Sequence, residues 1–202
     1  MFKGSNIMQV THLVRAVIVA ATSTVLTGCL VPEKFNASVT VRPDGAYTYK
    51  YQGTAVHMLA AMEIKKSGSL SAKAESQLKA DAEKAAKAPG VKKLTYQGSG
   101  RYEVSVDRDL KVGQRAEVLS IVSLTTSRDG VYTLSASQLK EKERAELMGL
   151  GIKVDGTVEV TLPANAKVLT QNASSTPGLF SKSYSWKVNG YDAKPAMTFT
   201  LN

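Results

Sequence analysis

The chain has 202 residues, of which 26 are Lys or Arg and 17 are Asp or Glu, giving a formal net charge of +9 at neutral pH. Its single cysteine excludes an intramolecular disulfide and a zinc site built from several thiolates. A basic balance favours contact with anionic lipid head groups or anionic polymers, and it is equally typical of a solvated surface that keeps a protein soluble.

An apolar segment near the amino terminus ends in the tetrad Leu26-Thr27-Gly28-Cys29. It follows Arg15, so a basic region, a short apolar run and small residues occur in the order of a cleaved secretory segment. The order is the same whether translation starts at Met1 or Met8. The tetrad resembles the lipobox of bacterial lipoproteins. A transmembrane anchor is the alternative, but spanning takes about 20 apolar residues and polar residues interrupt this run.

The lipobox resemblance implies a lipoprotein signal peptide over residues 1–28, a lipidated tether over 29–34 and one domain over 35–202. It also implies that the thiol of Cys29 carries a diacylglycerol and that palmitate is among the acyl chains. These chains would anchor the protein to a membrane of the cell envelope, facing the periplasm. In such lipoproteins the residue after the cysteine governs sorting, and Leu30 implies the outer membrane in a cell with two membranes.

The anchor narrows the expected partners. An exported lipoprotein rarely meets nucleic acid, and the lysines are dispersed along the chain, so no nucleic-acid partner is expected. Anionic lipid, an anionic envelope polymer and a protein of the envelope remain as expected partners.

Period-2 patterns and turn residues predict most of the strands. Residues 38–42 and 46–51 form a hairpin around Pro43-Asp44-Gly45, where proline fixes φ and glycine supplies positive φ. Further strands are predicted over residues 92–96, 101–106, 116–126, 157–162, 167–170, 183–188 and 196–201. In the last two, Trp186 and Phe199 mark the buried faces.

Three helices are predicted between these strands. Thr54 caps the first, over residues 55–66, and Ser69 or Ser71 opens the second, which continues to Ala88 before Pro89-Gly90. The third starts at Ser135 or Ser137 and ends at Met148. The predicted fold class is α+β, an antiparallel sheet with helices on one face.

A faint internal repeat runs through the domain. Residues 38–48 align with 123–133, residues 76–79 with 137–140, and residues 100–106 with 156–162. The alignment predicts a duplicated hairpin-helix-strand unit over 35–112 and 118–170, with both copies in one sheet. The alternative is that similar secondary structures recruit similar residues.

The predicted helix over residues 55–66 is apolar on nearly every side, which a simple surface helix is not. Burial under the second helix and the sheet is the favoured interpretation. The alternative is a lid over an apolar groove, or a face dipping into the bilayer. Met58 and Met62 would then line an acyl site, and Lys65 and Lys66 would meet head-group phosphates.

Signals of catalysis are weak. His57 is the one histidine left after residue 28, and a lone histidine among apolar neighbours is usually structural. Ser76-x-x-Lys79 and Ser137-x-x-Lys140 match the S-x-x-K of penicillin-recognising enzymes, but the K-S-G triplet over 66–68 precedes them, the wrong order for that family. No catalytic residue, metal ligand or cofactor is predicted, and Asp107-Arg108-Asp109 is interpreted as an ordinary loop.

Beyond the lipobox the chain resembles LppM-type lipoproteins, which place a Pro-Asp-Gly-like hairpin soon after the lipidated cysteine. The likeness extends to the segment 156–163, to Asn172 and to Tyr184-Ser185-Trp186. It implies association with envelope lipids and transfers no binding residue.

Three functions remain open. A lipid or amphiphile binder predicts an apolar cavity bordered by Met58, Met62 and lysines. A structural or assembly lipoprotein predicts a filled core and an exposed surface for a protein or polymer. An enzyme predicts a polar cleft with a paired base, and we rank the three in this order.

Overall fold

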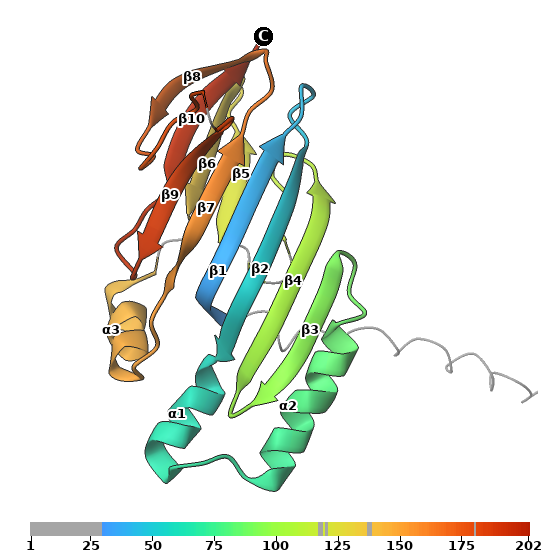
Figure 1. Ribbon diagram of the computed structural model, residues 1–202, viewed down its shortest axis with the longest axis vertical. Helices are drawn as coiled ribbons and strands as arrows, with labels where there is room; N and C mark the ends of the chain where they lie inside the picture. Colours follow the sequence, from blue (N-terminus) through green and yellow to red (C-terminus); the bar gives the residue numbers. More distant parts are fainter. Residues whose placement is uncertain (1–29, 117–118, 120, 137–138, 180) are drawn as a thin grey trace, which may run out of the picture.

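The computed structural model describes residues 30–202 except 117–118, 120, 137–138 and 180. In this part of the chain the strands form two sheets, and the helices lie in the lower half of the molecule (Figure 1). This architecture confirms the predicted α+β class. The tetrad that ends in Cys29 lies outside the described residues.

The larger sheet contains, in spatial order, β3 (Val91–Gly98), β4 (Arg101–Leu110), β2 (Tyr47–His57), β1 (Leu30–Val41), β7 (Asp155–Thr161) and β9 (Ser183–Asn189). Its neighbours are antiparallel except β1 and β7, which run parallel. The expectation of a purely antiparallel sheet was therefore wrong at one pair. Parallel neighbours need a long crossover, and here the chain between them builds five further strands and three helices.

The smaller sheet contains, in spatial order, β5 (Val122–Thr126), β6 (Val131–Ala136), β10 (Ala196–Leu201) and β8 (Ala166–Gln171), all antiparallel. It lies behind the upper part of the larger sheet in Figure 1. The predicted strand over 116–126 is thus shorter than expected. Ser135 lies in β6 and does not open a helix, because the second hairpin continues to Ala136.

The helices are α1 (Met58–Ser67), α2 (Ala72–Ala85) and α3 (Glu141–Gly149). Ser71 caps α2, as one of the two predicted candidates, with its side chain accepting from the Ala74 N–H at 3.2 Å. Thr54 does not cap α1, since β2 continues through His57. Lys140 stands at the cap of α3, and Ser137 lies outside the described residues.

The core lies between the two sheets. On β2, Tyr47, Tyr49 and Tyr51 alternate with polar residues and are each only 1% exposed. They share a cluster with Phe199 of the smaller sheet. The predicted buried faces of the last two strands are confirmed, because Trp186 and Phe199 are both buried.

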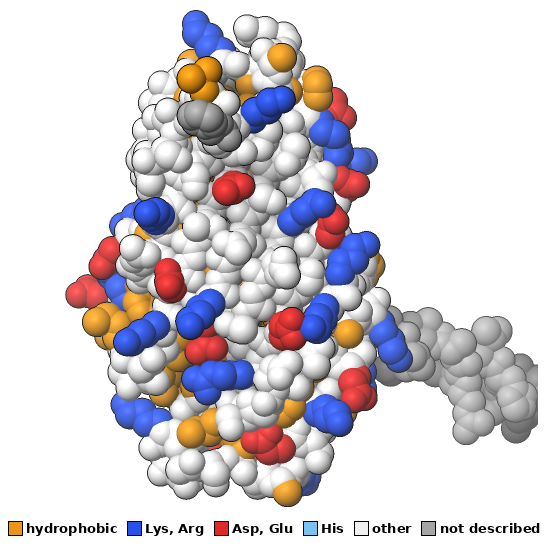
Figure 2. All heavy atoms as spheres, viewed as in Figure 1, with side chains coloured by type: hydrophobic (Ala, Val, Ile, Leu, Met, Phe, Trp, Pro, Cys, Tyr) orange, Lys and Arg blue, Asp and Glu red, His pale blue; other side chains and the backbone are white. Residues whose placement is uncertain are grey.

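Ala82 of α2 belongs to the same core cluster as Leu94 and Tyr102 of β3 and β4. The helix therefore packs on the inner face of the larger sheet, the face that also meets the smaller sheet. The outer face, with exposed Asn36 and Lys50, is turned to the viewer in Figures 1 and 2 and is not covered by any described helix.

The predicted tether over residues 29–34 was wrong for its described part. Leu30 already pairs with His57 at the start of β1, and it is buried. Val31, Pro32 and Phe35 do not follow the period of two that marks a regular strand. The reason is that β1 is irregular between Pro32 and Phe35. The first described residue, Leu30, is therefore already part of the sheet.

The two predicted repeats do not have the same topology. In the first, hairpin β1–β2 shares its sheet with β4, which pairs with β2. In the second, hairpin β5–β6 belongs to the smaller sheet, while β7 pairs with β1 in the larger one. The expectation that both units share one sheet in equivalent order was wrong. Short matches such as the two Asp-Gly turns reflect turn chemistry, since both Gly45 and Gly130 have positive φ.

Candidate ligand-binding cavity

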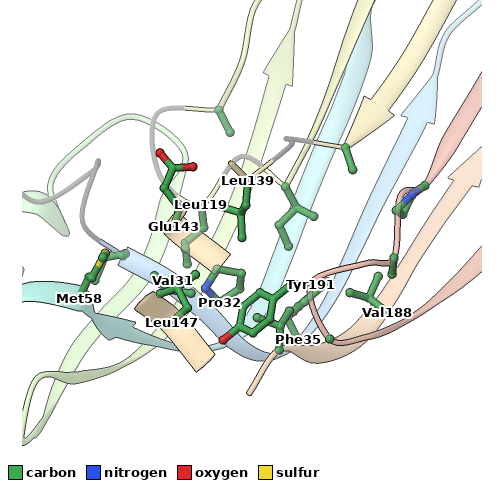
Figure 3. A pocket seen from close by; sticks show the side chains of 18 residues that line it. Val31, Pro32, Phe35, Met58, Leu119, Leu139, Glu143, Leu147, Val188 and Tyr191 are labelled. Atoms are coloured by element: carbon green, nitrogen blue, oxygen red, sulfur yellow. The ribbon is translucent and has the colours of Figure 1, made fainter. Parts of the chain in front are cut away.

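An open cavity of about 520 Å³ lies at the lower end of the interface between the sheets, beside α3 (Figure 3). Its volume falls within the range of about 300–1,000 Å³ that is typical of small-molecule sites. Its lining is mostly apolar. One wall comes from the start of β1, with Leu30, Val31, Pro32 and Phe35.

The β1 wall is held from behind by aromatic packing. Phe35 stacks on Tyr51 of β2, with ring centroids 5.8 Å apart and planes inclined by 17°. Such stacking stabilises the pair beyond what the burial of the two rings contributes. The irregularity between Pro32 and Phe35 turns both side chains toward the cavity, where Figure 3 shows them beside Tyr191.

The opposite wall comes from α3 and the segment before it, with Leu139, Glu143 and Leu147. The carboxylate of Glu143 accepts the Lys140 N–H at 2.8 Å and so caps the start of the helix. A helix of nine residues has little stability of its own, so α3 depends on the burial of Leu147 against Val56 and Ile152. This wall is therefore held by few contacts.

The third wall comes from the end of β9 and the loop that leads to β10. It includes Val188, Tyr191 and Ala193. The Tyr191 hydroxyl donates to the Ile152 carbonyl, and Asp192 forms an ion pair with Arg144 of α3. These two contacts tie the loop to α3 and to the segment that follows it.

The electrostatics of the cavity suit an apolar ligand with a polar end. Burial raises the pKa of Tyr191, with a smaller contribution from Glu33, so its phenol stays neutral at physiological pH. Glu143 supplies a carboxylate, and the aliphatic side chains supply no charge. The cavity therefore provides burial for a hydrocarbon chain, with the Glu143 carboxylate on the α3 wall and the Tyr191 hydroxyl on the wall after β9.

The structure separates the four predicted ligand-binding residues. Met58 lines the cavity, whereas Met62 is not among its lining residues and is 44% exposed. The Lys65 ammonium donates to the Gly149 carbonyl at 2.7 Å and links α1 to α3, and Lys66 is exposed. Of α1, only Ala60 is buried, so the interpretation of this helix as core was wrong.

Sequence reasoning missed most of the lining. The predicted tether includes Leu30 to Lys34, and the segment 188–195 carries no motif. Leu147 and Glu143 lie on a short helix without a clear apolar stripe. The apolar character of Leu30-Val31-Pro32 directly after the tetrad was the one available signal.

His57 has a structural role at the start of α1. Its Nδ1 accepts the Ala60 N–H at 3.3 Å, which caps the helix, and its side chain is buried. Burial lowers the pKa of His57, opposed by the negative charge of Asp81. The neutral imidazole is therefore the folded form, as expected for an acceptor.

The pKa shift predicts a loss of stability in mild acid. Below about pH 6.5 the unfolded chain binds a proton at His57 before the folded chain does, so the free energy of unfolding falls toward the lowered folded pKa. His57→Asn keeps a capping acceptor and removes the titration. We expect urea unfolding of this variant to change less between pH 7 and pH 5 than that of the wild type. An equal pH dependence in both chains would contradict the assignment.

The polar motifs noted in the sequence do not converge on a cleft. Ser76 and Lys79 are exposed on α2. Asp107 and Asp109 lie in β4, not in a loop; Asp107 pairs with Lys50 at 3.2 Å and Asp109 with Arg42 at 2.8 Å. Within the described ranges, no three His, Cys, Asp or Glu side chains form a group that could hold a metal ion.

No helix in the described part of the chain has both the length and the apolar character needed to cross a bilayer. No protein family model matches the sequence, and no curated protein matches it significantly. Among solved structures, the NMR structure of the folded domain of Mycobacterium tuberculosis LppM is similar, with a TM-score of 0.42 and 15% sequence identity. The match covers 91% of this chain and 95% of that chain. That domain is of the LppM type that the sequence resembles.

Proposed function

We propose that the protein is a lipid-anchored lipoprotein of the cell envelope, without enzymatic activity, whose cavity binds a lipid or another amphiphile. The observation that carries the proposal is the apolar cavity of about 520 Å³ whose lining begins at Leu30. That residue directly follows Cys29, so the cavity would lie next to the membrane that supplies its ligand.

The chemistry of the lining favours a hydrocarbon chain. Burying a methylene group contributes about 0.8 kcal/mol, so even a partly enclosed acyl chain gains several kcal/mol in an apolar cavity. The polar groups of the lining, Glu143 and the hydroxyl of Tyr191, suit a head group that stays close to water. A ligand with several buried charges would find no compensating partner there.

The outer face of the larger sheet favours a second candidate, a structural or assembly lipoprotein that binds an envelope protein or polymer. This open face carries mainly polar and charged side chains (Figure 2). Some of them form ion pairs, such as Lys50–Asp107. It offers no apolar centre of the kind that tight interfaces use. We therefore rank this function second.

Filling the cavity tests the first proposal. Ala193 lines the cavity in the loop after β9, and Ala193→Trp would occupy it with an indole ring. We expect the affinity for a fluorescent fatty acid to fall at least about tenfold, which corresponds to 1.4 kcal/mol. The matched control is Ala164→Trp, at an exposed position in the loop between β7 and β8. Unchanged affinity in Ala193→Trp, or no binding by the wild type, would contradict the proposal.

A further inference from the structure

The lower end of the molecule brings together α1, α3 and the start of β1 (Figure 1). Leu30 pairs with His57, the residue that caps α1, and Lys65 of α1 bonds to Gly149 at the end of α3. One peptide step of ~3.8 Å between Cα atoms separates Leu30 from Cys29, so an anchor on that cysteine must attach at this end.

Large apolar side chains are exposed at the same end. Leu59 and Met62 of α1 are 58% and 44% exposed, and Met148 of α3 is 65% exposed. Figure 2 shows hydrophobic side chains gathered on the surface over α3. Apolar groups of this size that cluster on a surface mark a site of contact with another apolar phase.

A lysine accompanies these side chains. Leu59, Met62 and Lys66 are spaced by three and four residues, which places them on one face of α1. A lysine in such a position extends its stem along apolar surface and keeps its ammonium group among polar head groups. We call Leu59, Met62, Lys66 and Met148 the helix tip.

We infer that the helix tip docks onto the anionic phospholipid surface to which Cys29 anchors the chain. This inference rests on the lipid anchor of the proposed function. Docking holds the domain upright, with the carboxyl terminus and β8 turned away from the bilayer. The side chains next to the helix tip, Met58 and Leu147, line the cavity, so docking brings the cavity to the lipid surface.

The sequence allows a direct test of this orientation. Acylation consumes the thiol of Cys29, so an engineered cysteine becomes the single free thiol of the mature chain. Met148→Cys and Leu59→Cys place a polarity-sensitive fluorophore on the helix tip. Leu169→Cys, 47% exposed on β8, is the matched control at the other end. The full acylated chain is reconstituted in vesicles of phosphatidylethanolamine and phosphatidylglycerol.

We expect a blue shift and protection from aqueous quenchers at positions 148 and 59, and neither at 169. Lys66→Glu should reduce the shift at 148, whereas Lys79→Glu on the exposed face of α2 should leave it unchanged. Fully aqueous spectra at 148 and 59 in an acylated, vesicle-bound chain would overturn the docking alone. A mature chain whose mass shows no acyl groups would overturn the anchor and the docking together.

Discussion

Gly53→Ala is expected to lower the free energy of unfolding by about 3 kcal/mol, because its side chain has no room beside β1. A Cβ atom at Gly53 would lie 2.1 Å from the Lys34 carbonyl oxygen and 2.7 Å from Cα of Phe35. Both obstacles are backbone atoms of the neighbouring strand, which cannot rotate away. The substitution must therefore separate β2 from β1 where the core is closed.

The effect should extend to the cavity. Gly156 on the other neighbour of β1 approaches the Phe35 carbonyl in the same way, with a Cβ distance of 2.4 Å. Phe35 is thus held between two glycines, in register with both, and forms part of the cavity wall. We expect Gly53→Ala to weaken fatty-acid binding as well as folding.

The measurement is the midpoint of urea unfolding, followed by tyrosine and tryptophan fluorescence. Gly178→Ala is the control, because a Cβ there meets nothing within 4 Å, and we expect a change within about 0.5 kcal/mol. Equal midpoints for the two variants would mean that β1 and β2 are not paired as described.

Cys29→Ser is expected to abolish acylation completely. A serine hydroxyl cannot form the thioether that anchors a lipoprotein, and in the proposed lipoprotein cleavage before residue 29 would depend on the acylated cysteine. We expect the precursor to keep its full mass and to incorporate no labelled palmitate. More than one acyl chain is needed for stable anchoring, so the wild-type chain should resist extraction by salt.

Thr27→Ser is the matched control for this variant. It changes a residue of the same tetrad and leaves the thiol intact, so processing and palmitate incorporation should continue. Normal maturation of Cys29→Ser would refute the lipoprotein assignment, independently of what the cavity binds.

The elements that the sequence predicted well are those with a strict period or a distinctive turn. The first hairpin follows from Pro43-Asp44-Gly45, and α2 follows from Ser71 and from Pro89-Gly90. Strands β9 and β10 follow from the alternation of apolar and polar residues, in which Trp186 and Phe199 lie on the buried faces. In each case local chemistry and long-range packing demand the same conformation.

The errors occur where long-range contacts override a local preference. Residues 55–57 read as the start of an apolar helix, but they are the end of β2, where Ala55 and Val56 pair with β4 and His57 pairs with Leu30 of β1. Leu30 to Lys34 read as a tether, although their pairing partners lie in β2 and β7, far along the chain. The cavity combines β1, α3 and the β9–β10 loop, an assembly that no local pattern encodes.

The central claim, that the cavity between the sheets and α3 holds a hydrocarbon chain, is tested most directly by photo-cross-linking. The full-length protein is irradiated with a diazirine-bearing fatty acid, and the labelled peptides are identified by mass spectrometry. We expect the label in segments 30–35, 139–147 and 188–195, the three walls of the cavity. Label confined to the outer face of the larger sheet, around residues 48–52, or the absence of saturable labelling, would contradict the account.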